Sequence, residues 1–163
     1  QGQVWVWDEV QFEILHPANV VAEKKNRVKD NDTSCVLRIA GVGGSAVVFG
    51  DIEKASEARL VSEQRIAQTD VAIVPHHGSR TSSTASLVLA VRARYALIGA
   101  GIGNRWGFPK PDVLARWRES GAATFVTAQS GAIDVAVDGR GVQAPSEYRA
   151  NHPRYWRIRS VRE

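Results

Sequence analysis

Short apolar segments separated by polar or glycine-rich turns run along most of the chain, and their spacing predicts alternating strands and helices. An alternating pattern on both sides of Asp8-Glu9 predicts a hairpin of residues 4–7 and 10–14. Residues 35–39 and 46–49 flank a turn that is rich in glycine, which predicts a second hairpin. The chain therefore opens with two pairs of strands.

Helical spacing of apolar side chains follows these hairpins. Residues 52–68 show it, with acidic residues toward the start, and so do residues 85–91 after the hydroxyl-rich stretch 79–84. A third helix is expected at residues 111–118, because Pro109-Lys110-Pro111-Asp112 opens it and Gly121 ends it. Strands at 95–98, 124–126 and 133–137, with a turn at Asp138-Gly139, are expected to complete the sheet. These elements predict an α/β (α+β) fold, with a mixed sheet and flanking helices.

Candidate metal ligands follow two of the predicted strands. The apolar run 71–74 leads to His76, His77 and Gly78, and the run 45–50 leads to Asp51. Imidazole nitrogen and carboxylate oxygen are ligands for zinc, manganese or iron, and chemistry in open α/β sheets gathers beyond the carboxyl ends of strands. The simpler alternatives are that Asp51 caps the following helix and that the histidines are partly exposed polar residues. Two consecutive side chains in a strand point to opposite sides, and the sequence does not decide which histidine faces the site.

Four segments, in this order and spacing, resemble the carboxy-terminal metallo-β-lactamase-like domain of ComEC-type competence proteins, the DNA-internalisation channels of naturally transformable bacteria. They are residues 31–37, residues 49–53, Val74-Pro75-His76-His77-Gly78-Ser79 and Asn104-Arg105-Trp106-Gly107-Phe108-Pro109. The resemblance covers nearly the whole chain. It implies a partial αββα sandwich in which Asp51 bridges two divalent metal ions, zinc or manganese, and His77 binds one of them. His76 would lie behind the ligands or face the substrate.

The same resemblance implies a function. The chain would be the hydrolase portion of a DNA-uptake protein, a metal-dependent nuclease that acts on single- or double-stranded incoming DNA. The parent protein would sit in the bacterial inner membrane, with this domain on the outer, periplasmic side and the membrane channel as its partner. The alternative is a non-catalytic nucleic-acid-binding or docking module of the same membrane protein.

Two departures from the resemblance bear on activity. The segment His-x-His-x-Asp-His, which supplies most metal ligands in that family, is absent, and His16 and His152 are the only other histidines. Phe108 stands where many relatives carry a histidine. Because the sequence begins at Gln1 and contains no methionine, we expect an excised carboxy-terminal half. The missing amino-terminal half would then be a partner, and this chain would be inactive or free of metal without it.

Other residues are candidates for contact with phosphate or nucleic acid. Ser79, Arg80 and Ser82 precede a predicted helix, whose amino end favours anions, although plain capping explains hydroxyl residues equally well. Asn104 and Arg105 follow a glycine-rich segment, residues 99–103, and are candidates for contact with the substrate. The neighbouring Trp106 is expected either to stack on a ligand or to close the core, and we favour the structural role.

Charge distinguishes the end of the chain from its body. The net charge is +4, and residues 146–163 carry five of the 21 basic residues but two of the 17 acidic ones. We therefore divide the chain into a domain at 1–145 and a basic aromatic tail at 146–163. Arg154, Trp156 and Arg157 are its candidates for pairing with phosphates and stacking on bases, and docking on the body is the alternative.

Two further features bound the interpretation. No apolar run approaches the roughly 20 residues that cross a bilayer, and no signal-peptide pattern begins the chain. The single cysteine, Cys35, excludes an internal disulfide and is expected to be a small core residue at the start of a strand.

Overall fold

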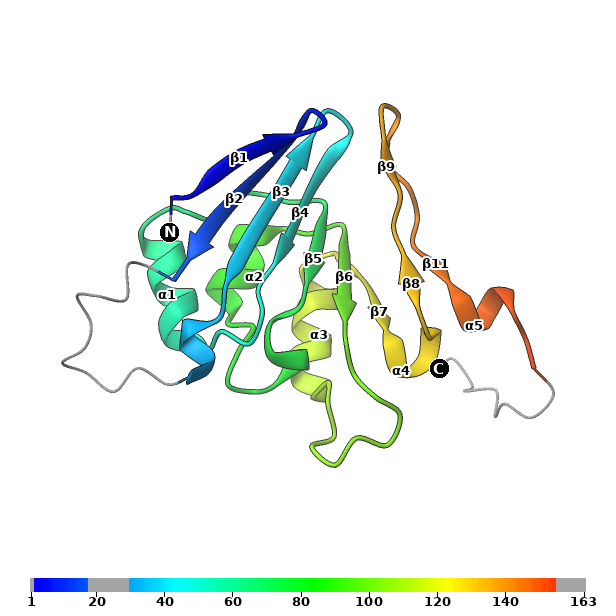
Figure 1. The fold of residues 1–163 in the computed structure, drawn as a ribbon. Helices are drawn as coiled ribbons and strands as arrows, with labels where there is room; N and C mark the ends of the chain where they lie inside the picture. The colour runs from blue at the N-terminus through cyan, green and yellow to red at the C-terminus, as the bar shows by residue number, and fades with distance from the viewer. Residues whose placement is uncertain (1, 18–29, 155–163) are drawn as a thin grey trace.

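The computed structural model describes residues 2–17 and 30–154, and its centre is a seven-stranded sheet (Figure 1). The strands are β1 (Val4–Trp7), β2 (Val10–His16), β3 (Val36–Gly41), β4 (Gly44–Val48), β5 (Val71–Ile73), β6 (Tyr95–Ile98) and β7 (Ala123–Val126). They lie side by side in chain order, antiparallel from β1 to β4 and parallel from β4 to β7. The predicted mixed sheet is confirmed.

Both predicted hairpins are confirmed. Asp8 and Glu9 form the turn between β1 and β2 with φ values of 50° and 64°, the left-handed conformation of a two-residue hairpin turn. In the second hairpin Gly41 pairs with Gly44, which leaves Val42 and Gly43 to make the turn.

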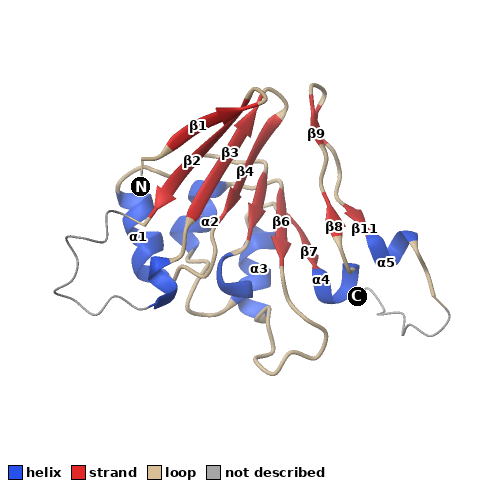
Figure 2. Ribbon diagram, viewed as in Figure 1, coloured by secondary structure: helices blue, strands red, loops and turns tan. Residues whose placement is uncertain are grey.

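Three helices lie on one face of this sheet and connect its parallel strands (Figures 1 and 2). They are α1 (Lys54–Ser62), α2 (Ala85–Val91) and α3 (Pro111–Glu119). The expected positions of α2 and α3 are confirmed, but α1 is shorter than the predicted helix at 52–68. It ends because Gln64 adopts a positive φ of 53°, which turns the backbone out of the helix.

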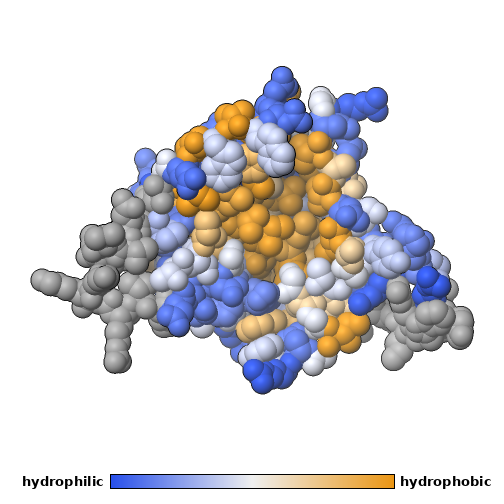
Figure 3. Space-filling model, viewed as in Figure 1, coloured by the Kyte–Doolittle hydropathy of each residue, from blue (hydrophilic) through white to orange (hydrophobic). Residues whose placement is uncertain are grey.

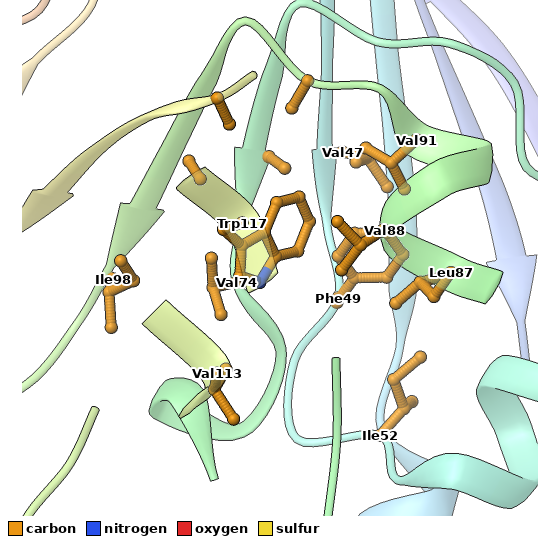
Figure 4. Close-up of a cluster of buried hydrophobic side chains, with 14 of the residues drawn as sticks. Val47, Phe49, Ile52, Val74, Leu87, Val88, Val91, Ile98, Val113 and Trp117 are labelled. Atoms are coloured by element: carbon orange, nitrogen blue, oxygen red, sulfur yellow. The ribbon is translucent and has the colours of Figure 1, made fainter. Parts of the chain in front are cut away.

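The main core fills the space between the helices and the sheet (Figure 4). Phe49 and Ile52, which follow β4, are both 0% exposed, as are Leu87 of α2 and Trp117 of α3. Burying side chains of this size contributes about 1.5–3 kcal/mol each. The apolar positions that predicted helices therefore hold the three helices against the sheet.

The opposite face of the sheet is also apolar, although no helix of the described residues covers it. Strand pairing aligns two rows of apolar side chains on this face, which we call the second face. One row is Trp5, Phe12, Ile39, Ala46, Val71 and Tyr95, and the other is Ile14, Leu37, Val48, Ile73, Leu97 and Phe125. Figure 3 shows the resulting apolar area at the centre of the view. Most of these side chains are only partly buried.

The chain beyond β7 forms an arm of short elements (Figure 1). They are α4 (Thr127–Ser130), β8 (Ile133–Asp134), β9 (Val137–Asp138), β10 (Gly141–Val142), β11 (Ser146–Glu147) and α5 (Tyr148–Asn151). The prediction that residues 133–137 complete the sheet is wrong, because β8 pairs with β11 and β9 pairs with β10. The predicted turn at Asp138-Gly139 is confirmed. Ile133 and Val135 pack on the second face instead of joining the sheet edge.

Cys35 and the charged run at residues 23–30 were also assigned from the sequence. Cys35 is exposed, so its assignment to the core is wrong; β3 begins one residue later, at the fully buried Val36. The run of charged residues at 23–30 predicts an exposed loop, and all of it except Asp30 lies outside the described residues. Within the described part of the chain, no helix is long and apolar enough to cross a membrane.

Candidate functional site

The candidate site lies where the carboxyl ends of β4 and β5 meet. These strands are parallel neighbours, with Val48 opposite Ile73. Beyond them the backbone N–H of His76 donates to the carbonyl oxygen of Gly50 at 2.9 Å. This hydrogen bond, which we call the backbone clamp, holds the segment that leads to Asp51 against the segment that carries the histidines.

The two histidines lie in a tight turn, which corrects the expectation that their side chains point to opposite sides as in a strand. The histidine turn (Pro75–Gly78) has left-handed backbone angles at both His76 (φ 48°, ψ 42°) and His77 (φ 55°, ψ 19°). Each such residue other than glycine costs about 1–3 kcal/mol, and strain of this kind concentrates at functional sites. The two rings are consequently not on opposite sides of a strand, and their centroids lie 6.4 Å apart.

His77 faces Asp51 with a defined tautomer. Its Nε2 lies 3.6 Å from Oδ1 of Asp51, and its Nδ1 lies 2.8 Å from the carbonyl oxygen of Gly99. A carbonyl oxygen only accepts, so Nδ1 carries a proton, and in the neutral ring Nε2 is then the nitrogen that presents a lone pair to the carboxylate. In that form two acceptors face one another and favour a cation between them. A histidine that donates its other N–H to a carbonyl is the usual arrangement of a metal ligand.

His76 belongs to a second pair. Its Nδ1 lies 3.6 Å from Oε1 of Glu53 and 3.2 Å from the hydroxyl oxygen of Thr81. The side chains of His76 and Glu53 are 19% and 11% exposed, against 55% and 45% for His77 and Asp51. Asp51 and His77 are therefore the accessible pair, and His76 and Glu53 lie behind them. Sequence reasoning missed Glu53, although its place two residues after Asp51 was a usable signal.

Asp51 does not cap α1. The residue that precedes the helix is Glu53, and its backbone N–H donates to Oδ1 of Asp32 at 2.9 Å. Asp32 is fixed in turn by His16, whose Nε2 lies 2.7 Å from the Asp32 carbonyl oxygen. Asp32 thus holds the backbone just before α1 from a position 21 residues earlier in the chain, and the carboxylate of Asp51 faces His77.

The donor pair fits a transition-metal ion. Two ligand atoms at about 2.0–2.1 Å from a tetrahedral zinc ion lie about 3.4 Å apart, close to the 3.6 Å between Nε2 of His77 and Oδ1 of Asp51. Nitrogen and oxygen donors suit zinc or manganese. No group of three or more His, Cys, Asp or Glu side chains arranged for a metal ion occurs among residues 2–17 and 30–154. Asp51 and His77 are thus two candidate ligands among the described residues.

The hydroxyl-rich segment after the histidine turn has mainly structural contacts. Ser79 and Ser82 are buried, and the Ser82 hydroxyl lies within hydrogen-bonding distance of the carbonyl oxygens of Pro75 (3.0 Å) and Ser79 (3.1 Å). At the start of α2, the backbone N–H groups of Ser83 and Thr84 donate to the carboxylate of Glu57. A carboxylate of the chain itself therefore occupies the position proposed for a phosphate.

Arg80 extends from the same segment toward α3. Its Nε donates to Oδ1 of Asp112 at 2.9 Å, and both side chains are exposed. Desolvation raises the pKa of Asp112, but the hydrogen bond from Arg80 and the charges of Arg80 and Arg116 outweigh it, so this pKa lies below its ordinary value. Solvent screens exposed pairs of this kind, so Arg80 can exchange Asp112 for another anion at little cost.

The glycine-rich segment after β6 forms a loop beside the histidine turn. Asn104 holds it closed: Nδ2 donates to the carbonyl oxygens of Gly101 and Phe108 at 3.0 and 2.8 Å, and Oδ1 accepts from the Phe108 N–H at 2.9 Å. Arg105 lies at its exposed tip. Trp106 is 56% exposed, so the favoured role in closing the core is wrong. The hydrophobic core is already filled by Trp117 beneath the sheet.

The basic tail is described only to Arg154, which is exposed. Trp156 and Arg157 lie outside the described residues. The first tail residues dock on the body, because the guanidinium of Arg149 donates to the carbonyl oxygen of Ala128 and the Ser130 hydroxyl donates to Glu147. The division at residue 145 stays a prediction.

Gly78 joins the histidine turn to this loop, and its replacement by alanine is expected to destabilise the chain by about 2–3 kcal/mol. Gly78 has a φ of 79°, and a Cβ there would lie 2.6 Å from Cβ of Pro109. Gly103→Ala is the matched control, because Gly103 also has a positive φ (61°) but faces open space. It should cost about 1 kcal/mol in urea unfolding. Equal losses in the two variants would contradict the close packing.

The chain is 36% identical to competence protein ComA of Neisseria gonorrhoeae over 143 residues, which cover 87% of this chain and 20% of that protein. It is 35% identical to recombination protein 2 of Haemophilus influenzae, over 82% of this chain and 16% of that protein. The chain is a homologue of bacterial competence proteins. The ComE operon protein 3 of Bacillus subtilis is 29% identical over 86% of the chain and 17% of its own length.

The resemblance to competence proteins is thereby confirmed, and the chain spans a fifth or less of the length of these relatives. No protein-family model matches it. The similarity to metallo-β-lactamases stays a prediction.

Proposed function

We propose that the chain is part of a metal-dependent phosphodiester hydrolase domain within a larger DNA-uptake protein. The observation that carries this proposal is the pair formed by Asp51 and His77, in which Nε2 and Oδ1 face one another at 3.6 Å. The hydrogen bond from Nδ1 of His77 to the Gly99 carbonyl oxygen fixes the ring for this role. The names of two relatives, competence protein and recombination protein, support a role in handling DNA.

The described residues have distinct roles in this proposal. Asp51 and His77 would hold a divalent ion, zinc or manganese, which supplies Lewis-acid chemistry toward a phosphodiester when bound. Gly99 orients His77 through its carbonyl oxygen, and Gly50 positions both donors through the backbone clamp. His76, paired with Glu53, would hold or move a proton near the reacting phosphate.

The site would be completed by other parts of the parent protein. The described residues offer two metal ligands, and the second face is a broad apolar surface without a helix over it. An apolar area of this extent is typical of an interface. We propose that another part of the parent protein packs on the second face to complete a metallo-β-lactamase-like αββα sandwich, supplying the remaining ligands and a second ion. The aligned residues cover 20% and 16% of two relatives, which leaves room for such a part.

We also propose that the parent protein is a channel in the bacterial inner membrane, with this domain on its outer, periplasmic side.

A second function is favoured by one observation, the exposed Arg105 and Trp106 at the tip of the loop after β6. These side chains suit nucleic acid without any metal. The chain would then be a non-catalytic nucleic-acid-binding module of the same parent protein.

Elemental analysis of the purified parent protein, with and without the substitutions Asp51→Ala and His77→Ala in this domain, tests the proposal. We expect bound zinc or manganese in the wild type and at least a tenfold loss of metal in either variant, because each removes half of the described donor pair. His152→Ala is the control, since His152 lies on α5's carboxyl end and should leave the metal content unchanged.

Cleavage of DNA with added Mn²⁺ should follow the metal in the same variants. A wild-type parent protein that binds no metal at this site, or variants that keep it, would argue against the hydrolase proposal and in favour of the binding module.

A further inference from the structure

The loop between β6 and α3 presents an aromatic side chain beside the candidate site. Asn104 closes the loop through its three hydrogen bonds, and the backbone N–H of Lys110 donates to the Gly78 carbonyl oxygen at 3.0 Å. The Nζ of Lys110 donates to the carbonyl oxygen of Trp106. The tip is therefore held in place against the histidine turn, although Trp106 itself is 56% exposed.

Aromatic rings connect this tip to the proposed metal ligands. The Trp106 and Phe108 rings are nearly parallel, at 12°, with centroids 6.2 Å apart. Phe108 meets His76 edge to face at 5.9 Å, and His76 is the neighbour of His77 in the histidine turn. A group that rests on Trp106 would thus lie two ring contacts away from His76.

Charge at the tip is positive. The guanidinium of Arg105 lies 4.4 Å from the centroid of the Trp106 ring, and residues 99–111 contain Arg105 and Lys110 but no acidic residue. Within the described part of the chain, Arg105 forms no ion pair. Trp106 offers an exposed ring on which a base could stack, and Arg105 beside it offers a positive charge for a phosphate. These are the two elements that bind single-stranded nucleic acid.

We propose that Trp106 and Arg105 form a nucleobase-stacking platform that holds single-stranded nucleic acid beside Asp51 and His77. A single strand is specified because the bases of a duplex already stack on one another, so an indole gains a base face only from an unpaired nucleotide. The incoming base takes the place of the Arg105 guanidinium on the ring, and Arg105 turns to the adjoining phosphate. This inference rests on the proposed function, whose substrate class it narrows.

The test compares the binding of two labelled oligonucleotides by fluorescence anisotropy, in EDTA so that no strand is cleaved. One is a short oligothymidylate, and the other has the same backbone without bases. Trp106→Ala should weaken binding of oligothymidylate about tenfold, since stacking is worth about 1–3 kcal/mol per base, and should leave binding of the abasic strand unchanged. Arg105→Ala should weaken binding of both strands and lower the salt dependence.

Trp7→Ala is the matched control, because Trp7 is 74% exposed but belongs to β1, at the far edge of the sheet. It should bind both strands as the wild type does. The platform is overturned if Trp106→Ala binds oligothymidylate normally, or if it loses both strands equally.

The outcome is separable from that of the proposed function. If binding depends on the bases and on Trp106, but Asp51→Ala leaves the metal content unchanged, the platform is supported and the hydrolase is rejected. If metal binding and cleavage depend on Asp51, but Trp106→Ala binds oligothymidylate normally, the hydrolase is supported and the platform is rejected.

Discussion

Replacing Glu57 by alanine is expected to lower the free energy of unfolding by about 3–5 kcal/mol, because its carboxylate joins α1 to α2 inside the core. The side chain is 0% exposed and accepts hydrogen bonds from the backbone N–H groups of Ser83 and Thr84. Without it both amides stay buried without an acceptor, at about 1–3 kcal/mol each, and a cavity remains. Urea unfolding followed by circular dichroism measures the loss.

The conservative variant Glu57→Gln separates charge from packing. Burial raises the pKa of Glu57 above its ordinary 4.5, although the amides of Thr84 and Ser83 and the charge of Arg116 oppose this shift. A raised pKa in the folded state means that the folded chain binds the proton more tightly than the unfolded chain. The resulting stabilisation is complete below about pH 4.5 and is lost as the pH rises through the folded-state pKa.

We therefore expect the wild type to exceed Glu57→Gln in stability by more at pH 4 than at pH 7. The opposite trend would mean that the amides and Arg116 outweigh burial.

Trp117→Ala should also cost about 3–5 kcal/mol. Trp117 of α3 is 0% exposed at the centre of the core (Figure 4), and its indole N–H donates to the Ser83 hydroxyl at 3.2 Å. Removing the indole loses its burial and leaves a large cavity. Chemical denaturation measures the effect, and Trp117→Phe should lose less because most of the ring remains.

Trp106→Ala serves as the control for Trp117→Ala, since Trp106 is exposed and should change stability by no more than about 0.5 kcal/mol. A loss there comparable to that of Trp117→Ala would mean that the loop after β6 is part of the folded core.

Local patterns were enough to predict the mixed sheet and to place Asp51 and the two histidines after strand ends that could share one site. Each main strand is an apolar run bounded by turn residues, and parallel strands bring their carboxyl ends to one edge. The arm was mispredicted because Ile133 and Val135 alternate as strand residues do, yet their partner is the second face of the sheet. Periodicity shows that a side chain is buried but not what it is buried against.

The contacts that sequence reasoning missed join distant residues. Asp32 receives the N–H of Glu53, and Glu57 receives those of Ser83 and Thr84, across separations of 21 to 27 positions. An acidic residue at the start of a helix is ordinarily a solvated residue that favours the helix dipole. Nothing in the local pattern distinguishes Glu57 from that common case. The left-handed turn at His76 and His77 could not be predicted from the sequence either, because glycine is the residue whose presence indicates such backbone angles.

The backbone clamp between Gly50 and His76 has a consequence for redesign. Because a carbonyl and an N–H hold the two donor segments together, their separation does not depend on which side chains Asp51 and His77 carry. Ligand chemistry can therefore be exchanged without rebuilding the scaffold: a histidine at position 51 or a carboxylate at position 77 would start from the same backbone geometry. The side chains at positions 51 and 77 set which ion is bound, whereas the backbone sets where it is bound. Substitutions among relatives can therefore change the ion and keep the backbone geometry.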